Sequence, residues 1–240
     1  KQVKERSEEL TRVQMELERA QRLSDIGTLS ATVAHELRNP LGVIRTANYN
    51  LRRKNTNQDL IKHFDNIDKK VLESDQIINN LLNYARIKTP NFEKTDLSLL
   101  IRECIENIVK RHVDEPLKIK TDLKEIKNLI INIDPVQIAE VFINILNNSS
   151  QAIVGNTGEI NIKAVLLSNK KVAITIADNG PGIPSEDLGR IFEPFFTRKS
   201  KGTGLGLTIC KELVHLHNGE IMVESQKNIG TKFTIILPTK

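Results

Sequence analysis

The pattern of apolar residues changes at about residue 88, and this change divides the chain into two regions of different structural class. Before it, apolar and small residues recur every three or four positions, glycine is rare and Pro40 is the only proline. Such spacing is typical of long amphipathic helices. After it, short apolar runs alternate with turn residues and glycine-rich stretches, which predicts a mixture of strands and helices.

The first region, residues 1–88, is predicted to form two long helices that are joined by a polar loop. An apolar seam of coiled-coil type covers residues 10–34, and a second apolar stripe covers residues 60–85. The polar sequence RRKNTNQ, residues 52–58, separates the two stripes. Two helices with one stripe each cannot close a core, so we expect an all-α helical hairpin that forms a homodimeric four-helix bundle.

The rest of the chain is predicted to contain a linker, residues 89–95, and a second domain, residues 96–240. The linker sequence TPNFEKT contains a proline that can stop the preceding helix. Helices are expected near residues 97–110, 135–153 and 205–216, and strands near residues 117–123, 129–133, 159–167, 171–177, 219–224 and 232–237. This order predicts an α+β sandwich in which helices cover one face of a mixed sheet.

The composition excludes several classes of protein. With 39% hydrophobic and 27% charged residues, the chain can bury a core. The net charge of +5 is modest and aromatic residues make up 4%, so we expect no nucleic-acid partner. No apolar run approaches the length of a membrane span, so no membrane contact is expected within this segment. Cys104 and Cys210 lack metal-ligand spacing, which favours buried thiols in a cytoplasmic chain or in the cytoplasmic portion of a membrane-bound protein.

The sequence HELRNP, residues 35–40, contains a candidate nucleophile. A neutral ring nitrogen of His35 can attack an electrophile, and the neighbouring carboxylate of Glu36 can hold the tautomer and balance the developing positive charge. Asn39 lies four residues after His35, so it shares a helix face with it and can position a ligand or a water molecule. An isolated His-Glu pair is usually no more than two surface residues, so this motif needs support from others.

The sequence EVFINILNNSSQA, residues 140–152, places Asn144 and Asn148 four positions apart on one helix. Amide oxygens are suitable ligands for Mg²⁺, which keeps several waters and takes further ligands from phosphates. Solvated asparagines are the ordinary alternative. Asparagine is a poor helix former, however, and this stretch contains three, which indicates a use beyond helix formation.

Two glycine-rich motifs follow, with an aromatic and basic stretch between them. In DNGPGI, residues 178–183, the Asp178 carboxylate can accept a hydrogen bond from an adenine amino group, although an ordinary turn is the alternative. GTGLGL, residues 202–207, opens a predicted helix whose free N–H groups could hold phosphate. In FEPFFTRK, residues 192–199, the phenylalanines can hold a mobile loop closed or can simply anchor it through hydrophobic contacts. Lys199 could reach terminal phosphates.

In this order and spacing, the motifs resemble the sensor histidine kinases of two-component systems over residues 23–238. HELRNP resembles the phosphoacceptor box of that family, and the others resemble its asparagine, glycine and phenylalanine boxes. The closing GTKF, residues 230–233, resembles the family's last strand. HELRNP and FEPFFTRK are most similar to the nitrogen-regulation branch. The resemblance implies a dimerisation and histidine-phosphotransfer domain followed by an α+β ATP-binding domain of the Bergerat, or GHKL, type.

The resemblance also implies roles for particular residues. His35 would be the phosphoacceptor, Glu36 its assisting base, and Asn39 the residue that orients water for dephosphorylation of the partner. Asn148 would be the Mg²⁺ ligand and Asp178 would recognise adenine. The implied ATP-binding residues are Asn144, Asn148, Asp178, Gly180, Gly182, Ile183, Lys199, Gly202, Thr203, Gly204, Leu205, Gly206 and Thr231. The implied cofactors are ATP and Mg²⁺, and the implied partners are a cognate response regulator and a second copy of the chain.

Three departures from the family pattern are small. Ser149 stands where alanine is usual, Arg198 where threonine is common and Asn218 where glycine is common. None of them removes a functional group, and Ser149 is expected to have little effect because serine and alanine are both small.

Two other functions compete with this interpretation. One is an ATPase clamp related to gyrase and heat-shock chaperones, which share the ATP-binding fold. HELRNP on a paired-helix domain argues against it. The other is a non-catalytic scaffold, against which the intact Asn148, Asp178 and glycine motifs argue.

Overall fold

The computed structural model describes residues 36–55, 57–85, 89–111, 117–153, 158–199 and 203–239. The chain forms two compact units, Lys1–Ile87 and Lys88–Lys240. Within the described ranges no helix is long and apolar enough to cross a membrane. The predicted seam over residues 10–34 and the candidate nucleophile His35 lie outside the described residues.

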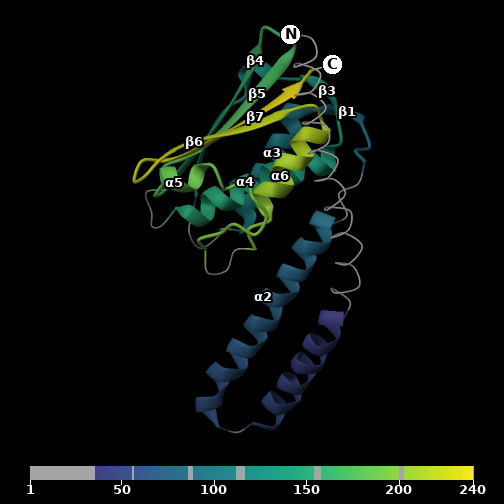
Figure 1. Ribbon diagram of the computed structural model, residues 1–240, viewed down its shortest axis with the longest axis vertical. Coiled ribbons are helices and arrows are strands. Elements are labelled where there is room, and N and C mark those ends of the chain that lie inside the picture. Colours follow the sequence, from purple (N-terminus) through teal and green to yellow (C-terminus); the bar gives the residue numbers. More distant parts are fainter. Residues whose placement is uncertain are drawn as a thin grey trace, which may run out of the picture. The chain divides into compact units, whose positions relative to one another are not determined.

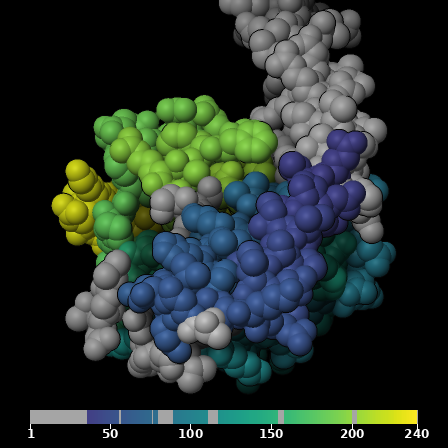
Figure 2. All heavy atoms as spheres, turned by 90° about the horizontal axis from the view of Figure 1, so that it is seen from below, coloured from purple at the N-terminus to yellow at the C-terminus, as the bar shows by residue number. Residues whose placement is uncertain are grey.

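The first unit contains a hairpin of two helices that lie side by side, drawn in purple and blue (Figures 1 and 2). Residues 36–54 form the first helix, and α2 (Ile61–Ala85) forms the second after the short 3-10 helix η1 (Gln58–Leu60). The Asn57 side chain caps η1 by accepting a hydrogen bond of 2.9 Å from the backbone N–H of Asp59. The predicted helical hairpin is confirmed.

The apolar stripe of α2 divides into a buried and an exposed set. Phe64, Val71 and Ile78, which are seven residues apart, are buried within the hairpin. Leu60, the last residue of η1, and Ile67 of α2 are also seven apart, and they remain 42% and 39% exposed. Since a seven-residue step returns to the same helix face, one line of side chains closes the hairpin and a second line is left open.

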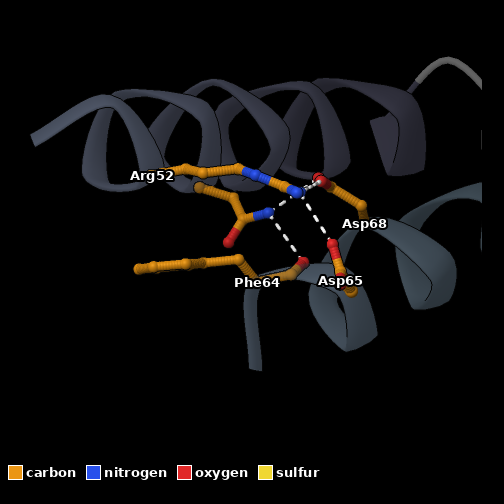
Figure 3. Close-up of polar contacts among 5 residues, drawn as sticks. Arg52, Phe64, Asp65 and Asp68 are labelled. Carbon is orange, nitrogen blue, oxygen red and sulfur yellow. Dashed lines mark hydrogen bonds and ion pairs between the residues drawn. The ribbon is translucent and has the colours of Figure 1, made fainter. Parts of the chain in front are cut away.

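A polar cluster ties the two helices together close to their loop (Figure 3). The buried Asn48 side chain donates hydrogen bonds of 3.0 Å to the Phe64 carbonyl and 2.7 Å to the Asp68 carboxylate. Arg52 of the same helix donates a hydrogen bond of 2.8 Å to Asp65 and lies 3.5 Å from Asp68. Because Asn48 is only 2% exposed, its bonds are shielded from water and define the register of the two helices.

The second unit is an α+β sandwich, as predicted. Its helices are α3 (Leu97–Arg111), α4 (Pro135–Ala152), α5 (Ser185–Leu188) and α6 (Gly206–Leu216), with the 3-10 helix η2 (Lys124–Ile126). Its strands are β1 (Glu93–Asp96), β2 (Lys118–Asp122), β3 (Ile130–Ile133), β4 (Glu159–Leu167), β5 (Lys171–Asp178), β6 (Glu220–Gln226) and β7 (Gly230–Pro238).

Five of these strands form one mixed sheet in the order β2-β4-β5-β7-β6. The β2–β4 pair is parallel and the other pairs are antiparallel. Helices α3, α4 and α6 cover one face of the sheet (Figure 1). Strand β7 buries every second residue, namely Thr231, Phe233, Ile235 and Leu237, which is the pattern of a sheet with one covered face.

The start of α4 shows why the chain turns from strand to helix at this point. The Asp134 carboxylate accepts hydrogen bonds of 3.0 Å from the backbone N–H groups of Val136 and Gln137, which satisfies two donors of the first turn. Pro135 needs no partner for a backbone N–H and suits the first helical position. The α4 helix, which carries both candidate asparagines, is thereby fixed at its beginning.

The end of the predicted linker, residues 89–95, overlaps a strand of the second unit. Glu93–Asp96 forms β1, which pairs antiparallel with β3 in a separate two-stranded sheet. The sequence EKTD gave no apolar signal for a strand, because main-chain pairing rather than side-chain burial forms β1.

Candidate functional site

The described part of the acceptor motif lies on an exposed surface. Glu36 and Asn39 belong to the helical residues 36–54, and both side chains are exposed. His35 lies outside the described residues, so its relation to Glu36 and Asn39 stays a prediction. The exposure of both neighbours leaves this helix face open to a second domain or protein.

Asp178 ends β5 and presents a buried carboxylate. The residue is 9% exposed. Its Oδ2 atom accepts a hydrogen bond of 3.0 Å from the Ser149 hydroxyl, and its Oδ1 atom accepts one of 3.0 Å from the Gly180 backbone N–H. These two donors hold the carboxylate in one orientation, and each oxygen keeps a lone pair. The arrangement therefore suits recognition of an amino group such as that of adenine.

The loop after Asp178 packs against the adjoining ends of β6 and β7. Gly182 has a φ of +69°, and a Cβ atom there would overlap the carbonyl oxygen of the last residue of β6. The Ile183 backbone N–H donates a hydrogen bond of 2.8 Å to Ser225, whose hydroxyl lies 3.0 Å from that of Thr231. Thr231 is also the register partner of Asp178. The structure thus brings four predicted ATP-binding residues together.

Lys199 connects the phenylalanine motif to α4. Its Nζ atom donates hydrogen bonds of 3.0 Å to Asn148 Oδ1 and of 3.0 Å to Gln151 Oε1. Burial lowers the pKa of Lys199, and the negative charge of Asp178 opposes this shift. The contacts place a cationic group beside the predicted Mg²⁺ ligand and within electrostatic reach of the predicted adenine acceptor.

The second glycine motif brings the start of α6 close to α4. Gly206 is the first residue of α6, and a Cβ atom added there would lie 3.8 Å from Asn144 Oδ1. Residues 203–205 lead into this helix, and Gly204 has a φ of +69°. Gly202 lies outside the described residues. The first N–H groups of a helix attract anions, so this end of α6 beside Asn144 can receive phosphate.

Asn148 offers one side-chain oxygen of the kind that Mg²⁺ uses when phosphates supply further ligands. Asn148 Oδ1 already accepts a hydrogen bond from the Lys199 ammonium group, so this oxygen faces a cationic partner. In the described ranges, no group of three or more His, Cys, Asp or Glu residues could hold a metal ion. Mg²⁺ commonly takes only one or two protein oxygens and completes its shell with phosphate oxygens and water. Asn148 is the candidate ligand of this type.

The structure adds residues that sequence reasoning did not assign. Ser149 was expected to be a neutral replacement, yet it donates a hydrogen bond to Asp178. Gln151 shares the Lys199 amino group with Asn148, and its position three residues after Asn148 on α4 was the available signal. The contacts of Arg198 depend on two residues of α5, Glu186 and Asp187, and had no signal in the local sequence.

The two cysteines are buried, as expected. Burial raises the pKa of Cys210 to about 12 and that of Cys104 to about 11. Both thiols therefore stay protonated near neutral pH, where they act as small apolar side chains rather than nucleophiles.

Both units match known protein families. Residues 25–90 match the family described as the His kinase A (phospho-acceptor) domain. Residues 133–240 match the family described as the histidine kinase-, DNA gyrase B-, and HSP90-like ATPase.

Curated relatives align with nearly the whole chain. The signal transduction histidine-protein kinase AtoS of Escherichia coli is 34% identical over 94% of this chain and 37% of its own length. Sporulation kinase C of Bacillus subtilis is 32% identical over 99% of this chain and 55% of its own length. The sensor histidine kinase ZraS of Escherichia coli is 32% identical over 94% of this chain and 48% of its own length. The chain thus spans between 37% and 55% of these relatives.

Solved structures share the fold. The catalytic domain of the histidine kinase ThkA is 33% identical, with a TM-score of 0.54 over 62% of this chain and 96% of that domain. ThkA in complex with the response regulator protein TrrA is 29% identical, with a TM-score of 0.67 over 92% of this chain and 64% of that chain.

Proposed function

The chain belongs to the sensor histidine kinases, and on this basis we propose that it transfers the γ-phosphoryl group of ATP to its own His35 and then to an aspartate of a response regulator. One observation carries the proposal. A phospho-acceptor domain is followed, in one chain, by an ATPase fold in which Lys199 donates a hydrogen bond to Asn148 and the next residue, Ser149, donates one to Asp178. The phospho-acceptor match argues against the gyrase-type or chaperone-type clamp, and the relatives AtoS and ZraS support the nitrogen-regulation-like branch.

The ATP-binding unit would hold the nucleotide from its base to its terminal phosphate. Asp178, oriented by Ser149 and Gly180, would accept a hydrogen bond from the adenine amino group. Lys199 and the N–H groups at the start of α6 would contact the β- and γ-phosphates. Asn148 would be the protein ligand of Mg²⁺, whose contribution is to neutralise charge on the phosphates.

The acceptor helix would supply the nucleophile. A neutral ring nitrogen of His35 would form the new N–P bond as the bond from the γ-phosphorus to the bridging oxygen breaks, so ADP leaves. Glu36 would hold the imidazole in the reactive tautomer and accept the ring proton. The phosphohistidine would then pass its phosphoryl group to a regulator aspartate. The exposed face around Glu36 and Asn39 would leave the phosphohistidine accessible to the regulator.

A response regulator and a second copy of the chain are the proposed partners. The ThkA–TrrA complex is a precedent for regulator binding by a similar chain. The exposed apolar residues Leu60 of η1 and Ile67 of α2 support a four-helix bundle, because burial of this line of side chains needs a second hairpin. We further propose that Asn39 orients the water that removes phosphate from the regulator.

Incubation with γ-labelled ATP tests the kinase activity directly. The wild-type chain should gain a label that is labile in acid and stable in alkali, as a phosphohistidine is. His35→Ala should lose this label and retain nearly unchanged ATP affinity, because the two units form separate cores. His63→Ala is a matched control, since His63 is an exposed histidine of the same unit and should not affect labelling. An acid-labile label on the His35→Ala chain would refute the acceptor assignment.

A further inference from the structure

Arg198 is anchored to α5 by an ion pair with two contacts. Its Nη2 atom donates a hydrogen bond of 2.8 Å to Asp187 Oδ1, and its Nε atom lies 2.6 Å from Asp187 Oδ2. A further hydrogen bond of 3.0 Å reaches Glu186. Asp187 is 4% exposed. A guanidinium that meets both oxygens of a buried carboxylate is restricted in orientation as well as in distance.

The next residue, Lys199, makes its contacts on a different helix. Its amino group bonds to Asn148 and Gln151 of α4, whereas the Arg198 guanidinium bonds to residues of α5. Two consecutive residues thus connect α5 with the predicted phosphate side of α4. Since the residues are adjacent, fixing the Arg198 side chain also limits the conformations open to the Lys199 backbone.

We propose that Arg198 is a positioning residue, which holds Lys199 at the terminal-phosphate site through its ion pair with Asp187. This inference rests on the proposed function, because it assigns Lys199 to the γ-phosphate. A Lys199 side chain that is already confined to the site loses less conformational entropy when ATP binds. Arg198 therefore increases the preference of the site for ATP over ADP without contacting the nucleotide.

A purely structural role for the pair predicts different behaviour. Loss of Arg198 leaves the buried Asp187 carboxylate without its guanidinium partner, and such a change can destabilise the whole unit. A destabilised unit would bind ATP and ADP less well by the same factor. A positioning role would weaken the affinity for ATP selectively, because ADP lacks the phosphate that Lys199 contacts.

The test measures dissociation constants for Mg-ATP and Mg-ADP by calorimetry on the full chain. Arg198→Thr, which introduces the residue common in the family, should weaken ATP binding about tenfold and ADP binding less than about twofold. Lys199→Ala should show the same selective loss. In the double variant the ATP affinity should match that of Lys199→Ala alone, since Arg198 acts through Lys199.

Three further variants separate positioning from folding. Arg198→Lys should restore part of the ATP preference, because an ammonium group can pair with Asp187 but cannot meet both oxygens. Arg198→Thr combined with Asp187→Asn removes the buried carboxylate charge together with its guanidinium partner. This double variant replaces Arg198→Thr in the test if Arg198→Thr fails to fold. Lys232→Thr is the control. It removes a half-exposed cation that pairs with Glu224 at 2.7 Å, and it should change neither affinity.

Equal losses of ATP and ADP affinity in a folded Arg198→Thr chain would overturn the positioning role. An unchanged ATP preference in Lys199→Ala would also overturn it. A double variant that binds ATP more weakly than either single variant would show that Arg198 contacts the nucleotide itself. Failure of the wild-type chain to bind ATP would instead contradict the proposed function.

Discussion

The hydroxyl of Ser149 donates a hydrogen bond of 3.0 Å to the carboxylate of Asp178. It joins α4, which carries the two candidate asparagines, to the end of β5. Both residues are buried, so the bond is shielded from water. The predicted adenine acceptor and the predicted Mg²⁺ ligand Asn148, the residue before Ser149, are therefore held in a common framework.

Asp178→Asn should lose most of its nucleotide affinity. One of the two side-chain oxygens would become an NH₂ group, which would face the donor of Ser149, the donor of Gly180 or the adenine amino group. A mispaired buried donor costs roughly 1–3 kcal/mol, which corresponds to about tenfold to a hundredfold in affinity. Calorimetry with ADP measures this loss. Asp122→Asn, on the exposed edge strand β2, should bind normally, and unaltered ADP binding by Asp178→Asn would refute the adenine assignment.

Asn39→Ala should keep self-phosphorylation and lose phosphatase activity toward the phosphorylated regulator. The amide of Asn39 can orient a water molecule, but it cannot take the proton from the imidazole of His35. The side chain is exposed, so its removal should not disturb the hairpin core. Labelling and regulator dephosphorylation should be measured on the same preparation. Equal loss of both activities would show that Asn39 supports the acceptor rather than the water.

Ile67→Asp should convert the proposed dimer into a monomer. Ile67 is 39% exposed on the open line of α2, where a second hairpin would bury it. An unpaired carboxylate in that interface should weaken association by on the order of 3 kcal/mol or more. Light scattering measures the mass, and γ-labelled ATP measures the kinase activity. The activity should decrease as the dimer is lost. Leu166→Asp, at a similarly exposed apolar residue of β4, is the control. A wild-type monomer with full kinase activity would refute the four-helix bundle.

Two substitutions at Asn48 should differ in their effect on the hairpin. Asn48→Asp would place a carboxylate where an amide now donates a hydrogen bond of 2.7 Å to Asp68, and should destabilise by roughly 2–4 kcal/mol. Asn48→Leu also loses both hydrogen bonds, but it removes a buried Oδ1 atom that has no hydrogen-bond partner within the described residues. Asn48→Leu should therefore destabilise the hairpin by only about 1 kcal/mol. Thermal unfolding followed by circular dichroism ranks the variants, and equal melting temperatures would contradict the role of Asn48 in setting the register.

Local patterns were sufficient to predict most of the elements of the second unit. The Asp134-Pro135 pair marks the beginning of α4, and the alternating apolar residues of β7 mark a strand with one covered face. These signals are local because caps and one-sided burial depend on residues only a few positions apart. Strand β1 left no such signal, since its pairing with β3 is made by the main chain.

The sequence alone was enough to predict most residues of the candidate site, because the order of the motifs resembles one family over most of the chain. The tertiary structure decided how these residues are held. Ser149 and Asp178 are 29 positions apart, Asn148 and Lys199 are 51 apart, and Arg198 meets Asp187 across 11 positions and a turn of the chain. Hydrogen bonds and ion pairs of this kind depend on the distance between side chains in the folded molecule. For Ser149 and Asp178, the packing of α4 against β5 sets that distance. A pattern of residue types along the chain does not contain that distance, so the contacts of Ser149 and Arg198 could be assigned only from the fold.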